Sequence, residues 1–88
     1  MKINGEFILR EIAGDTILVP VGQTALKFNG IITLEPVGAT IWKSLEAGLN
    51  FEEILTKILD TFEVERDRAE MDLKEFLAQL EKQGFLVS

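Results

Sequence analysis

The side chains of this chain that could carry out acid–base chemistry are carboxylates near its C-terminal end. Asp67, Asp72 and Glu75 lie there close together, and a pair of acids is what general acid–base catalysis often uses. The chain contains no cysteine and no histidine, so it offers these acids neither a thiolate nor an imidazole as partner. Unpartnered acids on a helix surface usually serve only as solvated charges. We therefore predict that the protein is not an enzyme.

Two further patterns that could indicate ligand chemistry have simple structural explanations. Glu52 and Glu53 would lie in the first turn of a helix, where negative charge complements the helix dipole and needs no metal to explain it. The glycines occur singly, so no phosphate-cradling loop is present. We expect no metal site and no cofactor.

Size and composition set the class of protein. A chain of 88 residues with 47% hydrophobic and 27% charged residues can form one hydrophobic core, and we expect a single domain over residues 1–88. The N-terminal segment alternates charged and apolar residues, unlike a signal peptide. No segment approaches the ~18 apolar residues of a membrane span. We expect a cytoplasmic protein with no membrane partner.

The elements that must position these side chains begin with short β-rich runs. Four runs are rich in β-branched and aromatic residues, FILREI, TILVPV, ALKF and IITL, at residues 7–12, 16–21, 25–28 and 31–34. Gly14-Asp15 suits a tight hairpin between the first two. Asn29-Gly30 suits either a hairpin turn or a bulge, since the alternation of apolar residues does not reset across it. The runs predict an N-terminal three-stranded antiparallel sheet, with room for one extra short strand.

After Pro36 the hydrophobic period changes from 2 to about 3.6 residues, which predicts three helices. Pro36 suits the first turn of the first helix, and Gly48 its end. The spacing of Trp42 within that helix favours packing in the core over an interface role. Asn50 with Glu53 indicates a capping box for the second helix. The apolar residues of the second helix are Phe51, Ile54, Leu55, Ile58, Leu59 and Phe62.

The third helix is predicted from about Arg66 to Gln83, with Gly84 as its left-handed cap. Phe85, Leu86 and Val87 then return apolar surface to the core. The predicted fold is α+β, with an antiparallel sheet followed by three helices.

The segment LEPVGATIW and the later stretch DTFEVERDRAEMDLKEFLAQLEKQGFL resemble the PqqD family, whose members are also described as precursor-peptide recognition elements. The resemblance covers nearly the whole chain, in order. The chain departs from it at Leu34-Glu35-Pro36, where family members often have Leu-Asn-Glu, and in a longer stretch from Val21 to Gly30. The resemblance implies a winged helix-turn-helix-like fold.

The resemblance also implies a noncatalytic peptide chaperone. Such proteins bind the leader of a ribosomally made precursor peptide as an added strand on their third strand, beside the third helix. They present the peptide to a modifying enzyme, commonly a radical SAM enzyme. The strand residues that would meet the peptide are Gly30, Ile31, Ile32, Thr33 and Leu34. An ordinary strand with one exposed isoleucine is the alternative reading.

Two flanks of the third helix could face such a peptide. The helical spacing places Asp72, Phe76, Gln79 and Gln83 on one flank, and Glu70, Lys74, Leu77 and Glu81 on the other. We favour the first, because it joins an aromatic side chain to two amides that both donate and accept. Phe76 could instead pack in the core, and Asp72 could pair with Arg68.

A winged helix could also bind DNA, so a DNA-binding or regulatory protein is the alternative function. The contacts would then be Arg66, Arg68, Lys74 and Lys82. The net charge of −6, with the whole acidic excess after Leu45, disfavours binding to a polyanion. We expect no nucleic-acid partner. The exposed edge of the third strand would also permit a homodimer.

Overall fold

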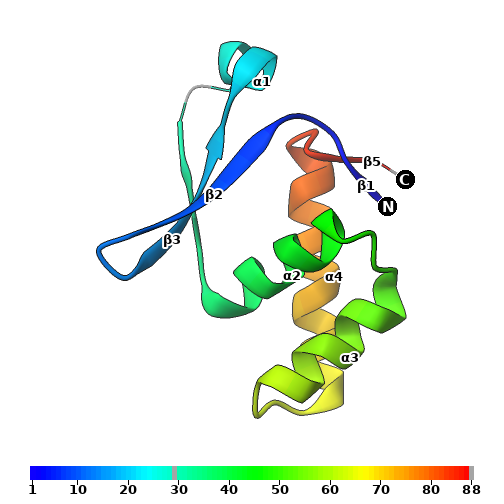
Figure 1. Cartoon of the computed structure of the whole chain (residues 1–88). Helices are drawn as coiled ribbons and strands as arrows, with labels where there is room; N and C mark the ends of the chain where they lie inside the picture. The colour runs from blue at the N-terminus through cyan, green and yellow to red at the C-terminus, as the bar shows by residue number, and fades with distance from the viewer. Residues whose placement is uncertain (29, 88) are drawn as a thin grey trace. The chain divides into compact units, whose positions relative to one another are not determined.

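The computed structural model describes residues 1–28 and 30–87 and contains two compact units. The elements follow in the order β1 (Lys2–Ile3), β2 (Phe7–Ile12), β3 (Asp15–Pro20), α1 (Gly22–Lys27), β4 (Ile32–Leu34), α2 (Pro36–Glu46), α3 (Phe51–Thr61), α4 (Arg66–Lys82) and β5 (Leu86–Val87) (Figure 1). One unit comprises Gly5–Ala39, and the other Met1–Asn4 with Thr40–Ser88. The predicted α+β class, with a three-stranded antiparallel sheet followed by helices, is confirmed.

In the unit Gly5–Ala39, β3 is the central strand of an antiparallel sheet with the order β2-β3-β4. The hairpin between β2 and β3 turns at Ala13-Gly14, since Ile12 pairs with Asp15. Both turn residues have positive φ, 53° at Ala13 and 85° at Gly14, as a two-residue type I′ turn requires. The hairpin was predicted, but its turn lies one residue earlier than the Gly14-Asp15 pair indicated.

The prediction of a strand at residues 25–28 is wrong, because Gly22–Lys27 forms the helix α1. Gly22 has φ 58°, which turns the chain out of β3. The helix and the residue before it are held to Glu6, which immediately precedes β2: Thr24 Oγ1 accepts a hydrogen bond from the Glu6 N–H (2.8 Å), and the Val21 N–H donates to the Glu6 carbonyl (3.0 Å). Asn29, at which the sequence suited either a hairpin turn or a bulge, lies outside the described residues. Both alternatives required a strand over residues 25–28, and that segment is largely helical.

The strand β4 leads into α2 with only Glu35 between them. The Ala39 N–H donates to the Glu35 carbonyl (2.9 Å), so Pro36 is the first residue of the helix, where its missing N–H leaves no gap. At the other end, Gly48 has φ 81°, and the Leu49 N–H donates to the Ser44 carbonyl (3.0 Å). The predicted start and end of this helix are confirmed. Trp42 is fully buried, as its spacing indicated.

In the other unit, α3 begins with the predicted capping box. Asn50 Oδ1 accepts from the Glu53 N–H, and Glu53 Oε1 accepts from the Asn50 N–H, both at 2.9 Å. Ile54, Leu55 and Ile58 are buried, and the other three predicted apolar residues of α3 are half-buried. The helix therefore presents its predicted apolar face to a core that includes Leu73, Leu77 and Leu80 of α4.

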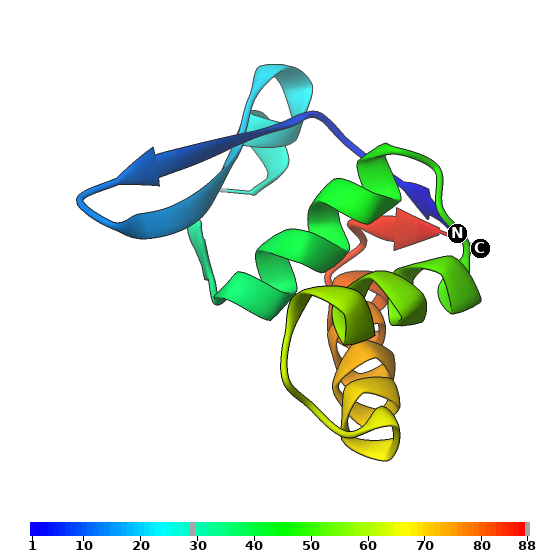
Figure 2. The same cartoon turned by 60° about the horizontal axis from the view of Figure 1, so that its bottom comes forward.

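A small sheet of β1 and β5 closes this unit, and the sequence did not predict it (Figure 2). Gly84 ends α4 with φ 82°, as predicted, and the chain then returns beside the N-terminal residues. Asn4 fixes the pairing, since its N–H donates to the Phe85 carbonyl (2.8 Å) and its side-chain amide to the Gly84 carbonyl (2.9 Å). Phe85 and Leu86 are buried as predicted, but Val87 is exposed because it points to the opposite face of the strand from Leu86.

Candidate functional site

The strand β4 has one open edge. Within the described residues it pairs only with β3, in the register Thr16 to Leu34, Ile17 to Thr33 and Leu18 to Ile32. An edge strand carries backbone N–H and C=O groups with no partner in the sheet, and these can template the addition of another strand. The predicted peptide-binding strand is thus an edge strand.

The register identifies which backbone groups of β4 face outward. The Val21 N–H donates to the Glu6 carbonyl (3.0 Å), so these two residues form a hydrogen-bonded pair in the β2–β3 ladder. Hydrogen-bonded and non-hydrogen-bonded pairs alternate, and the register is continuous. Ile17 lies four residues before Val21, an even number, so its backbone N–H and C=O also point toward β2. The backbone groups of the next residue, Leu18, point toward β4.

It follows that Ile32 and Leu34 use their backbone groups to bond β3. Thr33 lies between them, so its N–H and C=O point away from β3, to the open edge. Ile31 has the same parity as Thr33. The outward-facing groups of this strand are thus those of alternate residues centred on Thr33.

The side chains of β4 alternate as the sequence predicted. Leu34 is buried and Ile32 half-buried, on one face of the sheet. Thr33 is exposed, and so is Ile31, a residue that is 60% accessible to solvent. Gly30, just before the strand, is also exposed. The exposed isoleucine therefore lies beside an open strand edge.

The favoured flank of α4 forms a continuous stripe on the helix, within the other unit. Asp72 and Phe76 are half-buried, and Gln79 and Gln83 are exposed. Asp72 Oδ1 accepts from Arg68 Nε (3.1 Å), so the structural role considered for this acid is realised. On the opposite flank, Lys74 pairs with Glu70 (3.3 Å), as expected for a solvated face, although Leu77 is buried.

The bases that would contact DNA are largely paired with acids. Arg66 lies 3.4 Å from Glu52, and Arg68 and Lys74 form the pairs with Asp72 and Glu70. Each pair places a negative charge beside a base that phosphate contact would require, and so opposes the approach of a polyanion. The part of the chain that the structure describes holds no group of three or more acids that could bind a metal ion, and none of its helices is long and apolar enough to cross a membrane.

Residues 15–86 match the family model described as coenzyme PQQ synthesis protein D (PqqD). The chain belongs to the PqqD family. No curated protein sequence is significantly similar to it. The matched range begins at β3 and ends at Leu86, the first residue of β5, so it includes both β4 and α4.

Two solved structures resemble this PqqD-family chain over nearly its whole length. One is described as TbiB1 in complex with the TbiA(beta) leader peptide; it has 30% sequence identity and a TM-score of 0.76, and the alignment covers 98% of this chain and 94% of that one. The second is a lasso peptide synthetase B1 complexed with the leader peptide, at 18% identity and a TM-score of 0.75, covering 99% and 96% of the two chains. The second likeness shows the fold alone.

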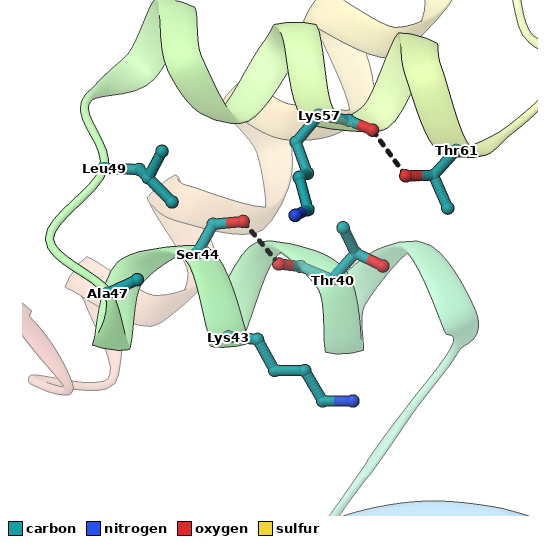
Figure 3. A pocket seen from close by; sticks show the side chains of 7 residues that line it. All are labelled: Thr40, Lys43, Ser44, Ala47, Leu49, Lys57 and Thr61. Carbon is teal, nitrogen blue, oxygen red and sulfur yellow. Dashed lines mark hydrogen bonds between the residues drawn. The ribbon is translucent and has the colours of Figure 1, made fainter.

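A separate hollow of about 230 Å³ lies between α2 and α3 of this PqqD-family chain (Figure 3). Its lining includes Lys57, whose amine points toward α2, whereas the amine of Lys43 points away from it. The Ser44 hydroxyl donates to the Thr40 carbonyl (2.8 Å), and the Thr61 hydroxyl donates to the Lys57 carbonyl (2.7 Å). The hydroxyl hydrogens are thus used within their own helices, and the hollow offers only one cation to a ligand. We assign it no function.

Proposed function

We propose that this chain is a noncatalytic peptide-recognition protein that binds the leader segment of a ribosomally made precursor peptide. The leader would add as an antiparallel strand to the open edge of β4. The observation that carries the proposal is the outward direction of the Thr33 N–H and C=O at an unpaired edge. Membership of the PqqD family, and a 30% identical relative described in complex with a leader peptide, support it.

Backbone bonds alone would not give useful affinity. About four bonds to Ile31 and Thr33, at roughly 0.5–1.5 kcal/mol each, supply only a few kcal/mol. A dissociation constant of ~1 μM requires about 8 kcal/mol. Side chains must therefore contribute the rest, and we propose that the peptide also contacts the α4 stripe formed by Asp72, Phe76, Gln79 and Gln83.

On this proposal the bound leader holds the remainder of the precursor peptide for a second protein, a radical SAM enzyme or another peptide-modifying enzyme. The chain itself would perform no chemical step, since it has no cysteine or histidine to act with its acids, and Asp72, one of the three candidate acids, is engaged in an ion pair with Arg68. A homodimer through β4 would use the same edge, so it would compete with the peptide.

The experiment that tests the proposal is a binding titration with the precursor peptide encoded beside this protein, followed by fluorescence anisotropy of the labelled leader. Saturable binding of the leader segment, with the separated core segment giving no signal, is the expected result. If the leader does not bind at protein concentrations of several hundred micromolar, the proposed function is wrong.

A further inference from the structure

One face of the three-stranded sheet, which we call the Ile17 face, carries the side chains of Ile8, Arg10, Ile12, Ile17, Val19, Ile31 and Thr33. Ile17 itself is buried, but Ile8, Val19 and Ile31 form an apolar row that is at least partly exposed and ends at the open edge. The register places Ile8 opposite Val19, and one residue beyond β4 it places Ile31 in the same row. The residues Ile8 and Ile31 are 41% and 60% accessible to solvent.

The exposure along this row is uneven for a geometric reason. Val19, on the central strand, has neighbours on both sides and is half-buried. Ile31, on the edge, has a neighbour on one side only. A strand added to β4 would place one side chain directly beside Ile31, at the spacing of a cross-strand pair. An apolar side chain there would complete the row.

The other end of the same edge is acidic. Glu35 follows Thr33 by two residues, and extending the register places it opposite Asp15. Both are exposed, and neither forms an ion pair with another described residue. The open edge is therefore flanked by exposed Ile31, just before β4, and by exposed Glu35, just after it, with Asp15 of β3 beside Glu35. The Glu35 carbonyl is already bonded to the Ala39 N–H, so only the Glu35 side chain is offered to a partner.

We propose that the Ile17 face reads the leader sequence through two side chains on that face of the added strand. This inference rests on the proposed antiparallel addition of the leader to β4. Because the two strands then run in opposite directions, the leader residue opposite Ile31 lies four positions after the leader residue opposite Glu35. The selected leader thus carries a basic residue and, four positions later, an apolar β-branched or aromatic residue. Both side chains lie on the Ile17 face, because residues two and four apart along a strand point the same way.

Selection from a phage-displayed library of random nine-residue peptides tests this proposal. The wild-type chain should enrich lysine or arginine four positions before an apolar residue. The Ile31→Lys variant should replace the apolar preference with an acidic one, and Glu35→Gln should lose the basic preference alone. Ile12→Lys is the matched control: Ile12 is 54% exposed on the same face but lies on β2, so the selection should not change.

A synthetic peptide of the selected sequence supplies the quantitative readout. Replacing its apolar residue with alanine should weaken binding to the wild-type chain about two- to fivefold, and should leave binding to Ile31→Lys unchanged. Circular dichroism confirms that each variant is folded.

The failures are distinguishable. The selected peptides could shift the Thr33 amide resonance and yet share no basic residue four positions before an apolar residue, or carry the two in the reverse order. Either result overturns this proposal and leaves the proposed function standing. If no selected peptide reaches the Thr33 amide, the proposed function itself fails. A wild-type dimer that Ile31→Lys converts to monomer, without peptide selection, would mean that a second copy covers the row, and would also overturn the proposal.

Discussion

Thr33 lies directly opposite Ile17 in the sheet, as a pair whose backbone groups do not bond each other. The backbone groups of Ile17 point to β2, and those of Thr33 point out of the sheet. The neighbouring residues on β4, Ile32 and Leu34, direct their backbone N–H and C=O groups to β3. The capacity of this edge to bind a peptide is therefore concentrated at Thr33.

The Thr33→Pro substitution should separate peptide binding from folding. Proline removes an N–H that the sheet does not use, and edge positions of this kind tolerate it. The free energy of unfolding should change little, whereas leader affinity should fall roughly two- to tenfold for the lost hydrogen bond. Titration by anisotropy and urea denaturation measure the two quantities.

Leu34→Pro is the matched control for that substitution. The Leu34 N–H bonds β3, so its removal should destabilise the sheet itself. Equal loss of stability in the two variants would contradict the assignment of the outward-facing groups.

The α4 stripe should contribute to affinity through its two amides. Gln79 and Gln83 are exposed, so the double substitution to alanine should not lower the free energy of unfolding. It should weaken leader binding by a few-fold or more if both amides bond the peptide. Lys74→Ala with Glu81→Ala, on the opposite flank of the same helix, should leave binding unchanged. If the second pair weakens binding and the first does not, the peptide faces the other flank.

Ala13 should be a site of avoidable strain. It adopts φ 53° in the hairpin turn, a conformation that costs an L-residue roughly 1–2 kcal/mol and costs glycine little. We expect Ala13→Gly to raise the free energy of unfolding by about 1 kcal/mol. Ala78→Gly, at an exposed position inside α4, should lower it by about the same amount. Thermal melts compare the two, and a destabilised Ala13→Gly would contradict the assigned turn.

DNA binding should be absent. Three of the four bases on and near α4 are paired with acids, and the net charge is −6. A gel shift at low salt, where even nonspecific binding is strongest, should show no complex at high protein concentration. A shift that disappears with added salt would instead favour the DNA-binding alternative.

The fold could be predicted from the sequence wherever a single residue type determines the start, cap or end of a helix. Pro36 began α2, Asn50 with Glu53 capped α3, and Gly84 ended α4. The segment around Leu26 misled because its alternation of apolar residues mimics a strand, while Gly22 and the Glu6–Thr24 hydrogen bond impose a helix. Leu26 is 87% exposed, so its hydrophobicity carried no information about the core.

The pairing of strands that lie far apart in the sequence could not be predicted either. The β1–β5 sheet depends on Asn4 meeting Gly84 and Phe85, which are far away in sequence. The candidate strand was predicted one residue too long, since residues 31–34 were expected and β4 covers Ile32–Leu34, but the exposed face of Ile31 and Thr33 was predicted correctly. The direction of the Thr33 backbone groups could not be predicted, because it follows from the phase of hydrogen bonds that begins at Glu6 and Val21. The apolar row on the Ile17 face likewise needed the three-strand register.

Amide hydrogen exchange at Thr33, measured by NMR with and without the leader peptide, tests the central claim most directly. Without peptide, the Thr33 N–H should exchange much faster than the N–H of Leu34, which bonds β3. Saturating leader should slow Thr33 strongly and change Leu34 far less. A Thr33 amide that is already protected in the free protein, or that stays unprotected at saturation, would contradict strand addition at β4.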